Sequence, residues 1–408
     1  MKKISITSIL LFSLVIPFIM TYRLSPGETS YWFFGLIFLG LLFYLILDLL
    51  KLKDIVYSKL KQIVLWFIII AVVGGSFTST IIVRHQTAPI YGVHDIILQQ
   101  EAAIRYLIHG KNPYSQTYFG TPLEEWHYSD TEINPALYHF VMEPFYLLFT
   151  LPFYFISNHT IGFFDARIPL LFLFFSILII GHLLIKDKEK KQLFLIFFTF
   201  NPAMLGYTLE GRSDIFMFAF LFFGFFLLQK NKYFLAGVPI GLAFVIKQSV
   251  WPILPLYFLF LYFKTNNLIK TLKVISPFVI TTAVIITPFF LWNQKAFLDS
   301  TVFYLSGAAP HSYPISGYGF GRILYEFGFI KSLTNYYPFQ IWQIIICLPT
   351  LILLAIFLKR KPSVYNLIIS YGIFLFVFWY FSRYFNNSHL GYLSTLFITA
   401  YFWPSVEQ

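Results

Sequence analysis

The sequence predicts an all-α protein that crosses a membrane about twelve times, with further amphipathic helices at the membrane surface. Of its 408 residues, 58% are hydrophobic, 22% are aromatic and only 12% are charged, and the mean hydropathy is +0.71. A soluble domain carries about twice that share of charged residues. Long apolar runs, with short clusters of lysine and arginine between them, complete the pattern of a polytopic membrane protein.

The apolar runs follow one another along the chain, and most are long enough to cross about 30 Å of hydrocarbon. The longer runs lie at residues 4–22, 31–50, 63–83, 166–185, 192–209, 274–293, 339–358, 363–381 and 390–403. Shorter or interrupted runs lie at 135–157, 215–229, 234–246 and 250–263. The first run follows Met1-Lys2-Lys3, as in a signal peptide, but no small-residue cleavage site follows it. We therefore expect an uncleaved first span.

Six basic clusters set the expected orientation, because lysine and arginine are retained on the cytoplasmic side. They hold 18 of the 29 basic residues, namely Lys2-Lys3, Lys51/Lys53/Lys59/Lys61, Lys186/Lys188/Lys190/Lys191, Lys230/Lys232, Lys264/Lys270/Lys273 and Lys359-Arg360-Lys361. All six fall on one side only if one run does not cross. We assign this exception to 135–157, where Pro135, Pro144 and Pro152 predict breaks in a helix and Glu143 adds a charge. We expect short helices there, in or against the outer leaflet, and twelve spans with both termini in the cytoplasm.

Two large loops then face outward, at residues 84–165 and 294–338, and the first holds eight of the 18 acidic residues. We expect two accessory spans in residues 1–62 and a catalytic domain in residues 63–404. The protein is expected to be a multi-pass protein of a bacterial or archaeal type of cell membrane, with its site outside the cytoplasm. The basic residues do not gather on one exposed face, so no nucleic acid partner is expected. The single cysteine, Cys347, excludes a disulfide framework.

The stretch from His94 to Tyr114 is unusually polar for its surroundings. Its apolar residues recur at helical spacing, Gly110 marks a helix end, and Glu101 and Arg105 are spaced as an i,i+4 ion pair. We expect an amphipathic helix on the outer membrane surface, with Asp95 at its N-terminus. Asp95 can cap this helix or act as a general base at the mouth of a span, and the residues alone leave both interpretations open.

Two further polar groups are expected on the same side. The turn Leu209–Phe216 places Glu210, Arg212 and Asp214 between two spans. Arg212 and Asp214 can pair with each other or with lipid headgroups, or they can line a cavity opposite Asp95. Lys247 lies between two short apolar runs. It can extend to a lipid phosphate or, because interrupted spans line cavities, it can hold a substrate phosphate.

The last outer segments add three candidates. His311 lies in the Gly-rich and aromatic loop Pro310–Arg322, which is either a lid or a simple cover over the bilayer. Arg383 and His389 lie between the last two runs, and Arg383 is either a second phosphate ligand or an interfacial anchor beside Tyr384. The sequence has no GxGxxG, Walker, HExxH or GxSxG motif, so no nucleotide site is expected.

In this order, the motifs resemble those of the polyprenyl-phosphate-dependent glycosyltransferases of the GT-C fold, especially the GPI mannosyltransferase I type and its bacterial counterparts. The resemblance covers about residues 63–395. It rests on Asp95 at the exit of a span, Glu101-Ala102-Ala103, Gly110-Lys111-Asn112-Pro113-Tyr114, Asn134-Pro135-Ala136-Leu137, Gly211-Arg212-Ser213-Asp214, and Lys247 followed by Pro252. The GPI-type enzymes carry Asp-x-Asp where this chain has Val93-His94-Asp95. One aspartate beside a histidine is a poor site for a hard divalent cation, so we expect no metal and no other cofactor.

The resemblance implies inverting transfer of a hexose, expected to be mannose, from a polyprenyl-phosphate sugar to a lipid-linked or surface glycan, among membrane lipids. Asp95 would accept the proton of the acceptor, with a pKa raised by burial. The candidates for binding the donor phosphate or sugar are Lys247, Arg383, Arg212, Asp214, His311 and His389, with His94, Glu101, Glu210 and Tyr114 in supporting positions. The alternatives are a lipid or oligosaccharide transporter or flippase, which would place its charges near the middle of the bilayer, and an oligosaccharide ligase or polymerase.

Overall fold

The computed structural model describes residues 4–22, 31–127, 129 and 132–404. These residues form helices almost throughout, with one two-stranded sheet among them. The basic cluster Lys2-Lys3 and the acidic residue Asp130 lie outside the described residues. A polytopic all-α architecture is therefore confirmed.

Within the described residues, each of the twelve runs that we expected to span contains a helix. These helices are α1 (Ile6–Tyr22), α2 (Tyr31–Leu49), the continuous helix α3–η1–α4 (Asp54–Ile69, Ile70–Gly74, Gly75–Thr87), α7 (Arg167–Leu184), α8 (Lys188–Thr199), α10 (Asp214–Gln229), α11 (Tyr233–Phe244), α12 (Ile253–Thr265), α13 (Leu268–Trp292), α17 (Phe339–Arg360), α18 (Val364–Tyr380) and α19 (Asn387–Phe402). In the described part of the chain, five helices are long and apolar enough to cross a membrane, namely α2, Asp54–Thr87, α7, α13 and α17.

The outward faces of the longest helices carry large apolar side chains. Ile280 of α13 is 60% exposed and Leu353 of α17 is 67% exposed. A surface of this kind is unfavourable in water, whereas lipid tails are as apolar as the side chains themselves. The exposed faces of α13 and α17 therefore fit a multi-pass membrane protein.

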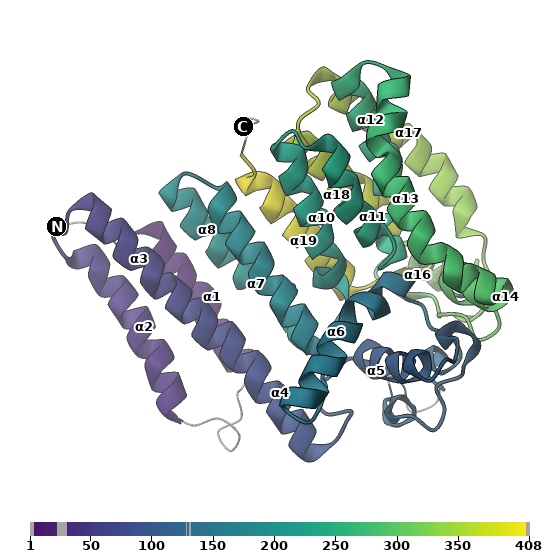
Figure 1. The fold of residues 1–408 in the computed structure, drawn as a ribbon, viewed down its shortest axis with the longest axis horizontal. Helices are drawn as coiled ribbons and strands as arrows, with labels where there is room; N and C mark the ends of the chain where they lie inside the picture. The colour runs from purple at the N-terminus through teal and green to yellow at the C-terminus, as the bar shows by residue number, and fades with distance from the viewer. Residues whose placement is uncertain (1–3, 23–30, 128, 130–131, 405–408) are drawn as a thin grey trace.

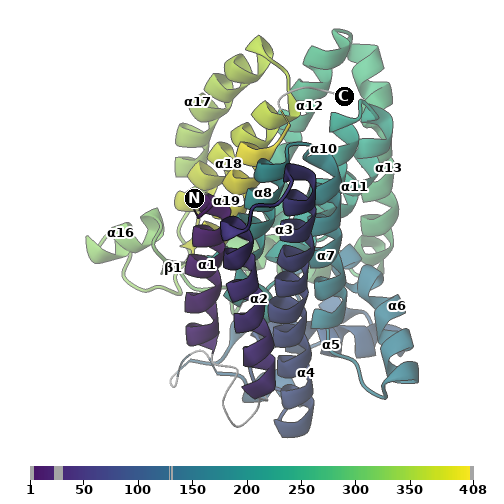
Figure 2. The same cartoon turned by 90° about the vertical axis from the view of Figure 1, so that its left-hand side faces the viewer.

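The long helices stand side by side, with α2, α3 and α1 at one edge and α12, α13 and α17 at the other (Figure 1). Most residues of α10 are buried, and it contacts α7, α11, α18 and α19. The helices α5 (Asp95–Ile108) and α6 (Pro144–Thr160) gather at one end of this bundle (Figure 1), whereas α16 (Phe320–Glu326) projects from its side in the second view (Figure 2). The central helix α10 begins at this end, so its first residue, Asp214, is fixed close to α5.

Two of the expected runs differ from the helices that form. The run 192–209 is divided into α8 and the short helix α9 (Leu205–Leu209), because Pro202 lacks an N–H for a continuous helix and the Asn201 side chain accepts the N–H of Ala203 at 3.1 Å. Conversely, α6 continues through Pro152. The expectation that the prolines of 135–157 divide the segment is correct only for Pro135 and Pro144, which occupy the first turns of η4 (Pro135–Leu137) and α6.

The predicted amphipathic helix around Asp95 is present as α5, but it is covered by the rest of the protein and does not lie exposed on a surface. All residues from Ile96 to Ile104 are buried, so α5 is exposed only at its first residue and in its last turn. Its polar side chains face protein partners instead of water. Gln99 Nε2 donates to the carbonyls of Ala136 and His139, and Gln100 Nε2 donates to the Thr150 hydroxyl at 2.9 Å.

The connecting segments form short elements over the same end of the bundle. The first loop contains η2 (Pro113–Ser115), η3 (Pro122–Glu125) and η4. The second contains α14 (Gln294–Leu298), η6 (Asp299–Phe303), α15 (Tyr304–Ser306) and β1 (Ser316–Gly317), before α16. The strand β1 pairs in parallel with β2 (Tyr384–Phe385), which ties this loop to the connection between α18 and α19.

Candidate active site

A cavity of about 510 Å³ lies at the end of the bundle that carries α5. It collects residues that are far apart in the sequence, because the N-termini of α5, α10 and α19 and the break after α11 all reach this end. Six of the predicted site residues line it, namely His94, Asp95, Arg212, Asp214, Lys247 and His389. The two carboxylates and two fixed cations in this set balance each other in charge.

Asp95 is the first residue of α5, and His94 is the residue that caps the helix. His94 occupies the N-cap position of α5, so the interpretation of Asp95 as the N-cap was wrong. The Asp95 carboxylate instead faces the cavity. One of its oxygens lies 2.5 Å from His94 Nδ1, and the other accepts from Asn134 Nδ2 at 3.3 Å.

The prediction that burial raises the pKa of Asp95 was also wrong, because the surroundings lower it. Burial acts to raise the pKa of this carboxyl, but the charge and hydrogen bond of His94, the hydrogen bond from Asn134 and the charge of Arg212 together hold it below the ordinary value. The structure therefore presents Asp95 as an ionised carboxylate at neutral pH.

The turn between α9 and α10 is packed directly against α5. The backbone N–H of His94 donates to the Glu210 carbonyl at 2.8 Å, and Gly211 adopts φ +90°, where a Cβ would lie 2.3 Å from Ile97. Only glycine satisfies both the left-handed conformation and this close approach. Arg212 then extends beside the Tyr207 ring, 4.3 Å from its centroid, and pairs loosely with Glu210 at 3.4 Å.

Lys247 and Asp214 form a close ion pair on the cavity wall. Lys247 Nζ lies 2.7 Å from Asp214 Oδ1. The Asp214 side chain is 1% exposed, whereas that of Lys247 is 21% exposed. Lys247 follows the end of α11 in an extended conformation, so its ammonium reaches the cavity while its carboxylate partner lies behind it. An ammonium has three donors, and an incoming anion can therefore be bound without breaking this pair.

The opposite wall comes from the start of α19 and the segment that β1 ties to it. Asn386 and His389 form a capping box, in which the Asn386 N–H donates to His389 Nδ1 at 2.9 Å. Tyr313 and Tyr384 lie beside them, with ring centroids 5.0 Å apart. These residues supply aromatic faces and hydrogen-bonding groups of the kind that hold a sugar ring.

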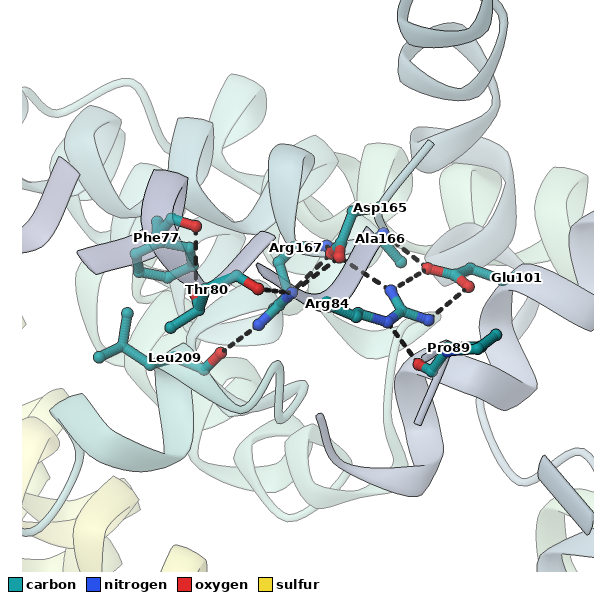
Figure 3. A network of polar contacts seen from close by, with 9 residues as sticks. All are labelled: Phe77, Thr80, Arg84, Pro89, Glu101, Asp165, Ala166, Arg167 and Leu209. Atoms are coloured by element: carbon teal, nitrogen blue, oxygen red, sulfur yellow. Dashed lines mark hydrogen bonds and ion pairs between the residues drawn. The ribbon is translucent and has the colours of Figure 1, made fainter. Parts of the chain in front are cut away.

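A buried network behind the cavity fixes α5 against α4 and α7 (Figure 3). Arg84 donates to both oxygens of Glu101, at 2.8 and 2.9 Å, and also to Asp165 at 2.8 Å. Asp165 in turn accepts from Arg167, whose guanidinium reaches the carbonyl of Leu209 at 3.4 Å. The network thus joins the helix that carries Asp95 to the turn that carries Asp214.

Several predicted residues have a different environment from the one expected. Glu101 does not pair with Arg105, which is exposed, because Glu101 turns inward to Arg84. Tyr114 is buried, and its hydroxyl donates to the Met142 carbonyl at 2.8 Å, so it supports a segment of the cavity wall without facing the cavity. Glu210 contributes its carbonyl to α5 and does not line the cavity.

Arg383 and His311 also lie away from the polar cavity. Arg383 is 2% exposed, and its nitrogens donate to the carbonyls of Tyr313, Leu333, Thr334 and Asn335. Burial lowers the pKa of Arg383 to about 10. These bonds hold the loop in place, and Arg383 lines the second cavity described below, so its role in binding phosphate stays a prediction. His311 is exposed and stacks on Tyr138, with ring centroids 3.7 Å apart, so it joins the two loops.

Sequence reasoning missed Gln248, which lies where two cavities meet, and the buried Glu143 that Gln248 contacts. A second, mostly apolar cavity of about 610 Å³ shares Gln248, Ser249, Leu305 and Tyr384 with the first. Gln248 Nε2 donates to Glu143 Oε1 at 3.1 Å and to the Thr301 carbonyl at 3.1 Å. Glu143 is 0% exposed, and burial raises its pKa to about 8. The one available signal was a carboxylate inside an apolar run, which we took only as evidence against a span.

Among the residues that the structure describes, no group of three or more His, Cys, Asp or Glu side chains comes close enough to hold a metal ion. The nearest candidate, His94 with Asp95, offers only two ligands, and one of these caps a helix. The Lys247 ammonium and the Asp95 carboxylate, which both face the cavity, are suited to binding an anion and to accepting a proton.

Comparison with known proteins identifies the family. Residues 140–400 match the model of glycosyltransferase family 87. The chain belongs to glycosyltransferase family 87. The matched region contains Arg212, Asp214, Lys247 and His389, whereas Asp95 precedes it. GPI mannosyltransferase 1 of Saccharomyces cerevisiae is 27% identical over 174 residues, which cover 40% of this chain and 36% of the yeast protein. The chain thus matches little more than a third of that relative, and no solved structure matches it.

Membership of family 87 decides between the classes of function that the sequence left open. A glycosyltransferase needs a sugar donor and an acceptor, and the family 87 chain presents a polar cavity in which both could react. Transferase chemistry is therefore favoured over a transporter or flippase. The resemblance to the GPI mannosyltransferase I type, which the sequence motifs indicated, is supported by the yeast relative.

Proposed function

We propose that this protein is an inverting, polyprenyl-phosphate-dependent hexosyltransferase of the GT-C type, with mannose as the sugar and a lipid-linked or surface glycan as the acceptor. One observation carries the proposal: the Asp95 carboxylate and the Lys247 ammonium face one cavity, and that cavity opens into an apolar one. The yeast relative, which is named for mannosyl transfer, supports the choice of sugar.

In the proposed reaction, the oxygen of an acceptor hydroxyl forms a bond to the anomeric carbon from the face opposite the phosphate. The bond from the anomeric carbon to the phosphate oxygen breaks, and its electron pair leaves with the polyprenyl phosphate. Asp95 takes the proton of the acceptor hydroxyl. Its low pKa suits a base that is always ionised and accepts the proton late, after the attacking oxygen has begun to bond and has become strongly acidic.

Lys247 is proposed to neutralise the charge that develops on the leaving phosphate, assisted by Arg212. The pairing of Lys247 with Asp214 at 2.7 Å holds the ammonium at the cavity wall. His389, Tyr313 and Tyr384 would then contact the sugar. In this proposal, Asp95 on the α5 side of the cavity accepts the proton, and Lys247 on the α11 side binds the phosphate.

The apolar cavity is proposed to take the first isoprene units of the donor. It is lined by Trp251, Phe339, Ile344, Leu348, Phe374 and Phe378, among others, and each methylene buried there contributes about 0.8 kcal/mol. A lipid donor of this kind requires no nucleotide fold, which agrees with the lack of nucleotide motifs in the sequence.

The proposal includes the topology that the basic clusters predict, with twelve spans, both termini in the cytoplasm and the polar cavity on the outer side. In support, the loops that hold basic clusters, such as 185–187 and 361–363, lie at the end of the bundle opposite α5. The positive-inside rule places that end in the cytoplasm.

The donor class can be tested directly with purified protein in vesicles. Labelled mannose would be supplied either as a polyprenyl-phosphate sugar or as a nucleotide sugar, with a membrane glycolipid fraction as acceptor. We expect label to enter the acceptor only from the lipid donor, and the new linkage to have the opposite anomeric configuration. Transfer from the nucleotide sugar alone, or retention of configuration, would contradict the proposal.

A further inference from the structure

A second polar cavity lies at the end of the bundle opposite Asp95. It measures about 480 Å³ and forms where the α7–α8 connection, the α17–α18 connection and the end of α19 meet. Helix α7 begins beside the buried network at Arg167 and ends at Leu184 in this cavity. Eighteen helical residues rise about 27 Å, so this cavity is well separated from the proposed active site.

Positive charge dominates this second cavity. Lys186, Lys190 and Lys361 line it, and Asp187 is the acidic residue among the lining side chains. The Asp187 carboxylate caps α8 by accepting the Lys190 N–H at 2.8 Å. Within the described parts of the chain, none of the three ammonium groups has a hydrogen-bond or ion-pair partner. The cavity therefore carries excess positive charge that an anion would neutralise.

Aromatic side chains border the lysines. Tyr365, Tyr401 and Trp403 line the cavity, and Tyr401 is 77% exposed. Tyrosine and tryptophan are enriched at the level of the lipid headgroups. This composition places the cavity at a membrane–water interface, where the available anions include lipid phosphates.

An apolar groove continues from this cavity along the bundle. The groove measures about 810 Å³ and shares Tyr401 and Phe402 with the cavity. It is walled by Ile6 and Leu10 of α1, Leu193 and Phe197 of α8, Phe376 of α18, and several residues of α19 from Leu390 onward. From Tyr401 to Leu390, α19 extends for about 16 Å, which is close to half of the roughly 30 Å hydrocarbon thickness.

We propose that this cavity and groove bind one anionic phospholipid from the bilayer. Its phosphate headgroup lies among Lys186, Lys190 and Lys361, and its acyl chains follow the groove between α1 and α19. The joined polar and apolar parts match the two parts of a lipid, whereas a free phosphate would leave the groove unused. Because α1 and α8 wall the groove together (Figure 2), the bound lipid connects the N-terminal helix to the rest of the bundle.

The proposal is tested by titrating the purified full-length protein with phosphatidylglycerol or phosphatidylcholine and counting bound lipids by native mass spectrometry. The test variant carries Lys186→Gln, Lys190→Gln and Lys361→Gln. Each lysine near an anionic headgroup contributes about fivefold in affinity, so we expect phosphatidylglycerol to bind roughly 100-fold more weakly and phosphatidylcholine to be little changed. A matched control, Lys188→Gln, Lys232→Gln and Lys270→Gln, removes the same charge from lysines outside the cavity and should keep the preference of the natural protein.

A second variant, Ile398→Trp, fills the groove without changing a charge and should weaken phosphatidylglycerol binding as well. Inorganic phosphate at millimolar concentration should not displace the lipid. If the cavity variant and the control lost phosphatidylglycerol affinity equally, the proposal would be overturned, because the loss would then reflect total charge and not these three lysines. Displacement by inorganic phosphate, or no effect of Ile398→Trp, would overturn it in favour of a simple anion site.

Discussion

At the scale of single residues, the ion pair between Lys247 and Asp214 has two separable roles. Removing only the lysine, as in Lys247→Met, leaves a buried carboxylate without its partner, which typically costs 3–5 kcal/mol. We expect this variant to unfold at lower temperature and to lose donor binding. The double variant Lys247→Met/Asp214→Asn should regain most of the stability, because no charge is left unpaired.

The double variant should nevertheless remain at least about 100-fold slower in transfer, since the phosphate still lacks its cation. Thermal unfolding and transfer kinetics on the same three proteins separate the two roles. A double variant that recovers both stability and transfer would show that Lys247 acts only as the partner of Asp214.

The buried Glu143 carboxyl makes stability depend on pH. Its pKa is raised to about 8, above the value near 4.5 of an unfolded chain, so the folded state holds a proton that the unfolded state releases. The resulting stabilisation is complete below about pH 4.5 and is lost as pH rises through about 8, with each unit of pKa shift worth about 1.4 kcal/mol.

Glu143→Gln keeps an uncharged group of the same shape that can still bond to Gln248. Between pH 5 and pH 9, the melting temperature of the natural protein should therefore fall by several degrees relative to the variant. Differential scanning measurements in detergent at four or five pH values would reveal the divergence. Parallel curves would contradict a protonated Glu143.

At the scale of secondary-structure elements, Gly211 determines how closely the α9–α10 turn approaches α5. Gly211→Ala would place a Cβ 2.3 Å from Ile97 in a conformation with φ +90°. We expect α5 to be displaced, transfer to fall by about tenfold or more, and stability to fall by about 1–3 kcal/mol.

Gly110→Ala is the matched control. Gly110 ends the same helix with φ +71°, but a Cβ there would meet nothing within 4 Å. This variant should lose only the stability that a left-handed backbone conformation costs an alanine, and it should keep most of its transfer activity. Similar losses of transfer in the two variants would argue against a role for the spacing between α5 and the turn.

The same scale shows what the sequence could and could not predict. Apolar runs located every long helix, because burial in lipid requires an uninterrupted apolar stretch. The surface position of α5 was mispredicted, because Glu101 pairs with Arg84 of another helix, and helical spacing within α5 indicates only the nearer Arg105. For the same reason, the carbonyls that surround Arg383 could not be foreseen. Asp95, Asp214 and Lys247, which line one cavity in the structure, could be selected from the sequence because few structural roles explain polar residues beside breaks in apolar runs.

At the scale of the whole molecule, the proposed orientation can be tested by labelling single cysteines from outside intact cells. Because Cys347 is the only cysteine in the sequence, Cys347→Ala provides a cysteine-free background. On it, Asn158→Cys marks the end of the bundle that carries α5, and Lys188→Cys marks the opposite end. A maleimide that cannot cross the membrane should label the first and not the second until the membrane is permeabilised. The reverse pattern would invert the proposed topology.

The central claim is that Asp95 accepts the proton of the acceptor during glycosyl transfer, and single-turnover transfer by Asp95→Asn tests it most directly. The variant keeps the shape and the contact with Asn134 but cannot accept a proton, so transfer from a polyprenyl-phosphate sugar should fall by about 100-fold or more while donor binding is retained. Transfer by the natural protein should stay constant from neutral pH down to about pH 5, because the carboxylate remains ionised there. Undiminished transfer by Asp95→Asn would contradict the account.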